Sequence, residues 1–182
     1  VLERRFRSMG LEAGILPGGR AVVATLSLGP LPFETPEGPR VLRAVRFSEK
    51  FDFKIGKHTL NLLKNSVKLD MFRTVSGARI ADELKSMLEE ETSGKALKKL
   101  SELGLLKLIH PSIVWDKEQE RLFERANDAL AWYELLYTKD HVERWLVLLL
   151  ALTDRLGEEE LALLVKRLVI SGRKRLDALS SR

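Results

Sequence analysis

The chain has 182 residues, no cysteine, and 31 basic against 26 acidic side chains, which gives a formal net charge of +5. Without cysteine, disulfide frameworks, thiolate metal sites and cysteine nucleophiles are excluded. The longest unbroken apolar run is residues 145–152, whereas a membrane-spanning helix needs about 20 apolar residues. We therefore expect a cytoplasmic protein with no membrane partner.

The excess of positive charge is concentrated in one stretch of the chain. Residues 37–75 carry 9 basic and 4 acidic side chains, whereas residues 76–182 carry 18 and 19. A polyanionic partner would be attracted to this stretch. An ordinary solvated surface would explain the same charge equally well.

Residues 1–36 are rich in glycine and proline, so regular structure there should be short. Between these breakers, residues 20–28 contain β-branched residues in partial alternation, which predicts one strand or one arm of a hairpin. A lone strand needs a partner, and if the chain is a fragment we expect that partner to have been cut away. We interpret residues 1–36 as a linker or as the remnant of an upstream domain.

From residue 37 onward the spacing of apolar residues is that of helices. Ser76 is expected to cap one helix, Gly104 to end another, and Pro111 to interrupt a connection over residues 106–115. The fold class predicted is all-α: an irregular multi-helix array with a short β or irregular N-terminal segment. Its helical part would comprise two domains, residues 37–115 and 116–182. The predicted helices are residues 40–51, 58–69, 76–90, 95–103, 118–137, 142–156 and 158–170.

Residues with the spacing needed for catalysis are absent from the sequence. His58, His110 and His141 lie too far apart to place two imidazoles on one helix face. No Asp-x-Asp pair occurs to hold two metal ions, and no nucleophile elbow or phosphate-cradling glycine loop is present. We therefore predict no catalytic residue, no metal ligand and no cofactor in this chain.

The segment of residues 37–53 (EGPRVLRAVRFSEKFDF) predicts a helix with one basic and one apolar side. At about 100° per residue, its basic residues span an arc of about 120°, and Phe47 intrudes on that arc. The planar guanidinium of arginine can pair with a phosphate or with the edge of a base. Ion pairs with Glu37 and Glu49 are the structural alternative. The basic residues are Arg40, Arg43, Arg46 and Lys50, and the apolar ones opposite are Val41, Ala44, Val45 and Phe51.

This helix is the first of three motifs that occur in order along the chain. They are residues 40–53 (RVLRAVRFSEKFDF), residues 75–87 (VSGARIADELKSM) and residues 95–106 (KALKKLSELGLL). Together they resemble the neck and body of class II tRNA nucleotidyltransferases and bacterial poly(A) polymerases. That family has an E-D-x-x-R-x-L-R-A-x-R-F helix, a G-F-x-I turn, an S-x-E-R-I-x-x-E-L helix and an A-L-x-x-L-x-x-L-G-L-L helix. The likeness spans residues 37–115, and residues 129–151 resemble the body and tail more loosely.

The resemblance implies a nucleotide-binding role for Glu37, Arg40 and Arg43. In the family, the Asp and Arg of E-D-x-x-R read the Watson–Crick edge of the incoming CTP or ATP; here Glu37 replaces that Asp, and Pro36 replaces the Glu before it. Contacts with RNA are expected from the basic residues that follow, Arg46, Lys50, Lys54, Lys57, Lys64 and Lys68.

The matching residues of the second motif are expected to link helices rather than to bind a ligand. They are Ser76, Arg79 and Glu83, and Ala78 stands where the family usually has Glu.

The family's catalytic head precedes the neck and carries a Gly-Ser turn and an Asp-x-Asp pair for two magnesium ions. Neither is found here, so the resemblance implies an upstream head domain in a longer parent, with Mg²⁺ and ATP or CTP as its cofactors, or a diverged relative without a head. The chain by itself is not expected to catalyse. Addition of CCA, of A alone and of poly(A) all stay open for the parent.

The function expected is to grip the 3′ end of tRNA or another RNA and to help select the nucleotide. The alternative is a helical protein-interaction scaffold with an acidic partner, to which Trp132, Tyr133 and Tyr137 would contribute, although aromatics at helical spacing usually lie in a core. A DNA-binding module is a weaker third choice, because no helix has groove-reading side chains at the required spacing.

Overall fold

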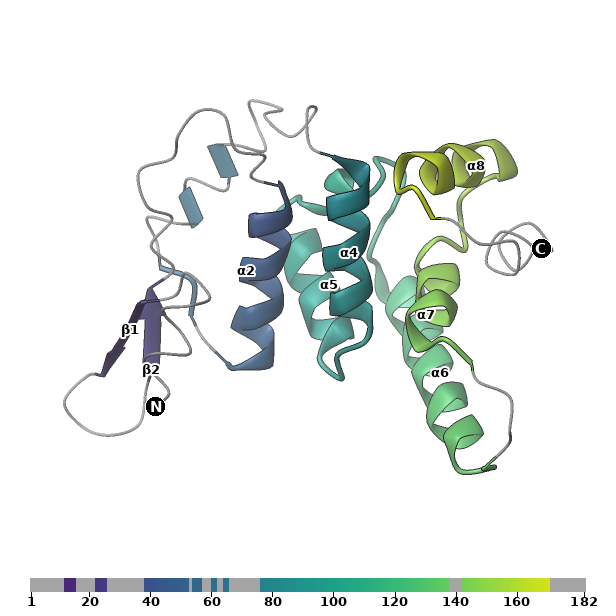
Figure 1. Cartoon of the computed structure of the whole chain (residues 1–182), viewed down its shortest axis with the longest axis horizontal. Coiled ribbons are helices and arrows are strands. Elements are labelled where there is room, and N and C mark those ends of the chain that lie inside the picture. The colour runs from purple at the N-terminus through teal and green to yellow at the C-terminus, as the bar shows by residue number, and fades with distance from the viewer. Residues whose placement is uncertain are drawn as a thin grey trace. The chain divides into compact units, whose positions relative to one another are not determined.

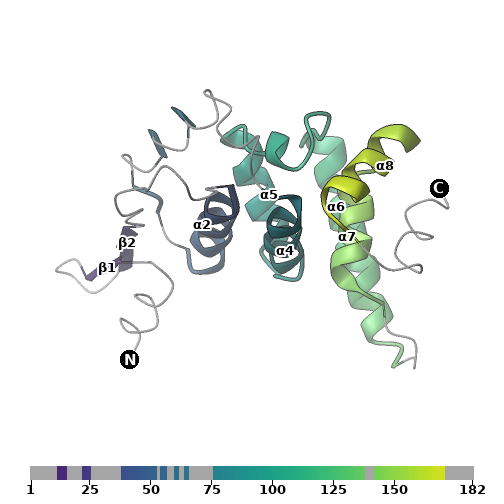
Figure 2. The same cartoon turned by 45° about the horizontal axis from the view of Figure 1, so that its top comes forward.

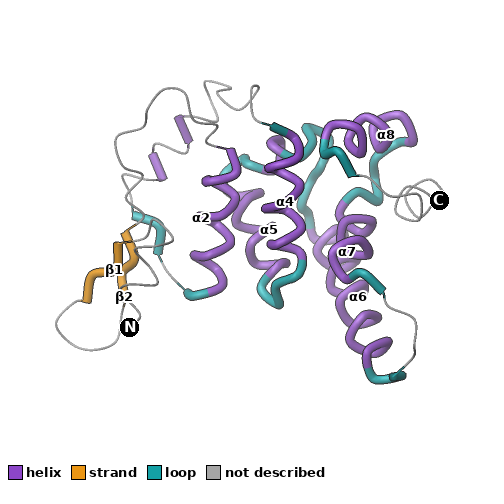
Figure 3. The backbone as a smooth tube through the Cα atoms, viewed as in Figure 1, coloured by secondary structure: helices purple, strands orange, loops and turns teal. Residues whose placement is uncertain are grey.

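The computed structural model describes residues 12–15, 22–25, 38–52, 54–56, 60–61, 64–65, 76–137 and 142–170. The chain forms two units, residues 1–75 and residues 76–182, and each is described by itself. Helices dominate the described residues, which confirms the all-α fold class with a short β segment near the N-terminus (Figure 3).

The first unit contains a two-stranded antiparallel sheet. Strand β2 (Val22–Thr25) lies within the predicted strand, and it pairs with strand β1 (Glu12–Ile15) so that Ile15 is opposite Val22. The expectation that the partner strand had been cut away is therefore wrong. The partner is a short segment of the same chain, which the glycine-rich sequence around residue 14 concealed.

Helix α2 (Gly38–Lys50) follows the sheet in the first unit. Pro39 lies in its first turn, where its missing N–H leaves no hydrogen bond unmade. The helix confirms the one predicted over residues 40–51. Most of the next predicted helix, residues 58–69, lies outside the described residues.

The second unit is built of five α-helices and one 3₁₀ turn over the described residues (Figures 1 and 2). Helix α4 packs against α5 and α7, and α6 packs against α5 and α7. The helices agree with the predicted ones, although α7 and the ends of α6 and α8 are shorter than expected. They are α4 (Gly77–Leu88), α5 (Ser93–Glu102), η1 (Leu106–Leu108), α6 (Lys117–Glu134), α7 (Arg144–Leu152) and α8 (Glu158–Arg167).

Leucine, isoleucine, methionine and the aromatic side chains of Phe123 and Trp145 are among the buried residues of the second unit. Phe123 of α6 is 1% exposed, and its ring meets that of Trp115 edge to face at 5.2 Å between centroids. Every helix contributes to this core, so burial of its apolar side chains stabilises the unit as a whole. Fully buried side chains include Ile80, Met87, Leu97, Leu100, Ile109, Leu148 and Leu149.

Two helix ends differ in how they are capped. Ser76 precedes α4 as predicted, but its hydroxyl makes no capping hydrogen bond, so the expected side-chain cap is wrong. Its backbone has φ −57° and ψ 122°. Gly104, in contrast, takes φ 69° and ends the turn after α5 as predicted.

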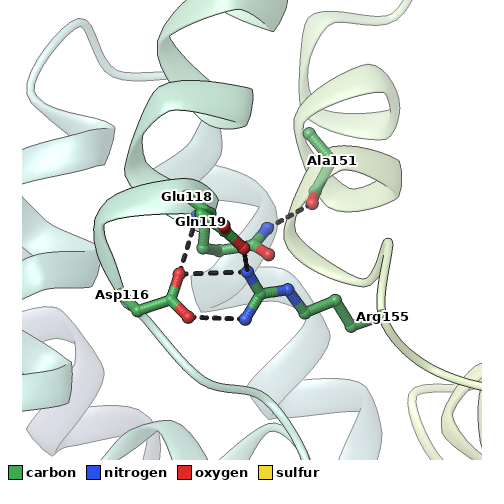
Figure 4. A network of polar contacts seen from close by, with 5 residues as sticks. All are labelled: Asp116, Glu118, Gln119, Ala151 and Arg155. Carbon is green, nitrogen blue, oxygen red and sulfur yellow. Dashed lines mark hydrogen bonds and ion pairs between the residues drawn. The ribbon is translucent and has the colours of Figure 1, made fainter.

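A network of polar side chains joins the start of α6 to the end of α7 (Figure 4). Asp116 caps α6 by accepting a hydrogen bond from the backbone N–H of Gln119 at 2.8 Å. The guanidinium of Arg155 donates to both Asp116 oxygens, at 2.6 and 3.2 Å, and to Glu118 at 2.8 Å. The side chain of Gln119 donates to the carbonyl oxygen of Ala151. The arginine hydrogen bond, followed by that from Gln119, lowers the pKa of Asp116.

Helix α7 covers only part of α6. Arg144, at the start of α7, donates to Asn127, and Gln119 meets Ala151 near the other end, so the two helices run antiparallel. Since α6 has 18 residues and α7 has 9, the last turns of α6 extend beyond the first residue of α7.

Candidate nucleic-acid interface

Helix α2 has the apolar and basic sides that the sequence predicted. Its apolar residues Val41, Ala44 and Val45 are buried, with at most 3% of each exposed. Arg43 and Lys50 are exposed on the other side, and Arg46 is half-buried. The helix therefore holds these basic groups in a fixed row along its surface.

One residue expected on the apolar side is not buried. Phe51 is 38% exposed, because α2 ends at Lys50 and the chain turns at Asp52, which has a φ of 53°. The prediction extended the helical spacing one residue too far, so it assigned Phe51 to a face that the helix no longer has.

Two basic side chains of α2 lie over aromatic rings. The Arg46 guanidinium carbon is 4.5 Å from the centroid of the Phe47 ring, and Lys50 Nζ is 5.9 Å from that of Phe51. The two ring centroids are 5.8 Å apart. Such cation–π contacts orient the cations along the helix. No contact between the basic side chains and these phenylalanine rings was predicted. The signal for such contacts in the sequence is a basic residue followed by Phe, repeated one turn later.

The remaining predicted contacts are only partly described. Lys54 and Lys64 are exposed. The backbone of Arg40 belongs to α2, but its side chain is not described, and the other three positions, Glu37, Lys57 and Lys68, lie outside the described residues. The assignment of nucleotide-binding and RNA-binding residues therefore stays a prediction.

In α4, the residues of the second motif are spread between surface and core. Arg79 is exposed, whereas Glu83 is only 6% exposed. A carboxylate buried to this extent is held by partners rather than by solvent, which supports its expected role within the protein.

His110, Ser112 and Glu160 are brought together by the loop after η1 and the first turn of α8. Ser112 Oγ donates to Glu160 Oε1 at 2.6 Å, and the Ser112 backbone N–H donates to His110 Nδ1 at 3.3 Å. The serine hydrogen bond, followed by that from the Gly157 N–H, lowers the pKa of Glu160. Because the hydroxyl donates to the carboxylate and not to the imidazole, the three groups do not form a nucleophile and its base. They fasten the loop to α8.

The aromatic residues at the end of α6 are not in the core. Trp132 is 63% exposed and Tyr137 is 91% exposed, which contradicts the expectation that aromatics at this spacing are buried. The physical reason is position: Trp132 lies on the side of α6 opposite the buried Phe123 and Leu130, and Tyr137 lies beyond the last residue of the helix.

Metal sites and membrane spans are both absent from the part of the chain that the structure describes. No group of three or more His, Asp or Glu side chains there could hold a metal ion. Among the described helices, none is long and apolar enough for a bilayer crossing.

The segment that follows helix α2 matches a family of known proteins. Residues 52–115 match a family described as the probable RNA- and SrmB-binding site of polymerase A. The chain is 39% identical over 120 residues to an A-adding tRNA nucleotidyltransferase of Geobacter sulfurreducens, an alignment covering 66% of this chain and 14% of that protein. These matches support a class II tRNA nucleotidyltransferase region in this chain. This confirms the resemblance seen in the motifs of residues 37–115.

Solved structures share the fold of this nucleotidyltransferase region. A CCA-adding enzyme in complex with CTP superposes with a TM-score of 0.72 at 24% identity, covering 86% of this chain and 36% of that one. The Thermotoga maritima CCA-adding enzyme complexed with tRNA gives a TM-score of 0.66 at 24% identity, covering 78% and 34%. The region thus corresponds to about a third of those enzymes.

Proposed function

We propose that this chain binds the 3′ end of tRNA and helps to select the incoming nucleotide, as the helical part of a tRNA nucleotidyltransferase or related poly(A) polymerase. The observation that carries the proposal is the match of residues 52–115 to an RNA-binding family. The exposed basic side of α2 lies directly before that segment. Catalysis would belong to a head domain of the parent protein, with Mg²⁺ bound there.

RNA would be bound through its phosphates and its shape. Arg43 and Lys50 project from α2, and Lys54 and Lys64 are exposed further along the unit. A-form RNA denies side chains access to its deep, narrow major groove, so the unpaired 3′ end and the backbone are the features available for recognition. The tRNA-bound solved enzyme with the same fold supports this choice of partner.

Nucleotide selection would fall to Glu37, Arg40 and Arg43. A planar guanidinium can donate two parallel hydrogen bonds to the edge of a base, and a carboxylate can accept from an amino group. The CTP complex of the enzyme with the same fold supports CTP as a ligand of the parent. The name of the 39% identical relative favours addition of A.

Salt dependence of tRNA binding tests the RNA part of the proposal. The affinity of the wild-type chain should fall as salt rises, with a log–log slope that reflects the phosphates neutralised. The combined variant Arg43→Ala, Arg46→Ala, Lys64→Ala should bind more weakly and with a shallower slope, by about 0.7–0.9 for each phosphate that is no longer neutralised. Lys98→Ala is the matched control, because Lys98 is an exposed cation that pairs with Glu120 at 3.0 Å.

An affinity that is independent of salt, or equal in the triple variant and the wild type, would contradict RNA binding by this surface. The nucleotide part is tested separately in the full-length parent. Arg40→Ala should change the ratio of CMP to AMP incorporated while the Kd for tRNA stays within about twofold, a difference of about 0.4 kcal/mol.

A protein-interaction role is the second candidate. It is favoured by the exposure of Trp132 and Tyr137 at the end of α6, far in the sequence from the basic stretch. The two functions would use different residues, so a single chain can have both.

A further inference from the structure

Helix α6 has an outer face that the proposed RNA-binding function does not use. We define the α6 outer face by four exposed residues of the helix, Arg121, Arg125, Asp128 and Trp132, together with the exposed Leu136 in the turn directly after it. At 100° per residue the four helical residues fall within an arc of about 60°. Phe123, which is buried in the core, lies about 200° away from Arg121, so the face points away from the helices that cover α6.

The α6 outer face exposes a large apolar area to solvent for a surface helix. Trp132 is 63% exposed, Leu136 is 45% exposed, and the neighbouring Leu135 and Tyr137 are 69% and 91% exposed. Aromatic side chains carry about 150–250 Å² each, so Trp132 alone exposes on the order of 150 Å² on this face, and Tyr137 adds exposed ring surface just beyond the end of the helix. Apolar patches of about 300–600 Å² on proteins often mark interaction sites.

The backbone at the end of this face is strained. Tyr137 has a φ of 49°, in the left-handed region that a residue with a Cβ enters at a cost in free energy. An exposed ring gains no burial that would offset this cost within one chain.

The arginines and the apolar side chains lie at opposite ends of the face, so that the arginine half of one copy can pair with the apolar half of another. Arg121 and Arg125 occupy its first half, and Trp132 and Leu136 its second half, with Asp128 between them. Neither arginine has a hydrogen bond or ion pair within the described part of the chain. A cation gains energy over the face of a tryptophan ring, so one half of the face fits the other half.

The sequence spacing of these residues is compatible with a two-fold axis perpendicular to the helix. Arg125 and Trp132 are equally far along the chain from the point between Asp128 and Ala129, and so are Arg121 and Leu136. A second α6 laid antiparallel about that point would place each Arg125 against the other copy's Trp132. Both pairs would form twice, as a closed, isologous interface requires. Each Asp128 would lie within one turn of an arginine of either copy.

We propose that the α6 outer face is an interface with a second copy of this chain, in which two α6 helices pair antiparallel about an axis beside Asp128. The interface is small: α6 from Arg121 to its end at Glu134 is about 20 Å long, and so short a helix pair buries less than the roughly 800 Å² per partner of a standard interface. The dimer is therefore weak, with a dissociation constant in the micromolar range. It forms without RNA and uses none of the basic residues of α2.

Sedimentation of the full chain, free of RNA, tests the proposal. Mass should rise from monomer to dimer over about 5 to 500 µM, and the dimer should persist in about 1 M NaCl, where the Debye length is about 3 Å. Trp132→Ala should weaken association at least tenfold and Arg125→Ala several-fold. The double variant should lose less than the product of the two effects, since both remove the same contact. Leu163→Ala is the control, because Leu163 of α8 is also exposed, at 64%, but lies on another helix.

Cross-linking tests the register independently. The chain has no cysteine, so Asp128→Cys creates a single thiol beside the proposed axis. Mild oxidation should convert this variant to a covalent dimer, and Ala162→Cys on α8 should stay monomeric. A chain that stays monomeric at the highest concentration would overturn the proposal. It would also fail if Trp132→Ala left the dimer unchanged, or if that variant lost affinity for tRNA while the chain stayed monomeric, because the face would then bind RNA.

Discussion

A Cβ atom at Gly77 would lie 1.7 Å from the backbone carbonyl oxygen of Arg167. The first turn of α4 and the last residue of α8 therefore touch backbone to backbone at this point. Arg167 is held there from its other side too, since its guanidinium donates to the carbonyl oxygen of Ile109 at 3.2 Å. Only glycine permits so close an approach.

The first prediction concerns this contact. Gly77→Ala should destabilise the protein by about 1–3 kcal/mol, because the added methyl meets a backbone atom that cannot rotate away. Gly94→Ala is the matched control in the first turn of α5, where the new Cβ would lie 3.8 Å from the Phe123 ring. Alanine there should be neutral or stabilise by up to about 1 kcal/mol. Urea unfolding followed by circular dichroism measures both; equal midpoints for the two variants would contradict the prediction.

The second prediction compares two helix ends of the same type. After α8, Val169 N–H donates to Lys166 and Ile170 N–H to Val165; after α5, Gly104 and Leu105 make the same pair of bonds. Gly104 has φ 69°, and Val169 has φ 53° although it is β-branched. Val169→Gly should therefore stabilise the protein by about 1 kcal/mol, since it removes left-handed strain at a position that is 63% exposed.

The reverse substitution is the control for this comparison. Gly104→Val should lower the urea midpoint, because it introduces at α5 the strain that α8 already has. A Val169→Gly variant that unfolds at lower urea than the wild type would show that the valine side chain contributes more than its backbone strain costs.

The third prediction concerns pH. The pKa of Asp116 is lowered in the folded chain, chiefly by Arg155, so the folded state gains stability above the ordinary pKa of 3.8. That gain is lost as the pH falls through the lower, folded pKa. Arg155→Gln should raise the pKa of Asp116 and weaken this acid dependence. Carbon NMR titration of the Asp116 carboxyl measures it, with Lys98→Gln, in a separate ion pair with Glu120, as the control. An unchanged pKa in Arg155→Gln would show that Gln119 alone causes the shift.

The fourth prediction contrasts two aromatic residues of α6. Phe123→Ala should cost about 3–5 kcal/mol, because its ring is 1% exposed and packs against Trp115. Trp132→Ala should change the stability of the monomer by less than about 0.5 kcal/mol, because Trp132 is 63% exposed. Thermal unfolding at low protein concentration compares them. A large loss in Trp132→Ala would mean that the ring packs within its own chain.

Local patterns in the sequence predicted much of the second unit. Apolar residues spaced three and four apart mark the buried sides of its helices, and Gly104 marks an end that needs a positive φ. These features depend on residues within one or two turns, so they can be recognised before the path of the chain is known. The ends of α6 and α7 were less predictable, since apolar residues continue past them.

For the candidate interface, the sequence predicted the helix and its two sides but not the contacts between individual side chains. The basic and apolar sides of α2 follow from spacing, but the placing of Arg46 over Phe47 depends on side-chain rotamers that spacing does not set. Phe51 was misplaced because the helix ends one residue earlier than its apolar pattern.

By itself, the sequence determined the helical class, the two-sided character of α2 and the match of residues 52–115 to the family described as the probable RNA- and SrmB-binding site of polymerase A. Only the tertiary structure decided that Asp116 pairs with Arg155, that Gly77 touches Arg167 and that Trp132 faces solvent. The reason is physical: helical spacing acts over about 5 Å along the chain, whereas these contacts depend on how separate helices pack and how far each extends beyond its neighbour.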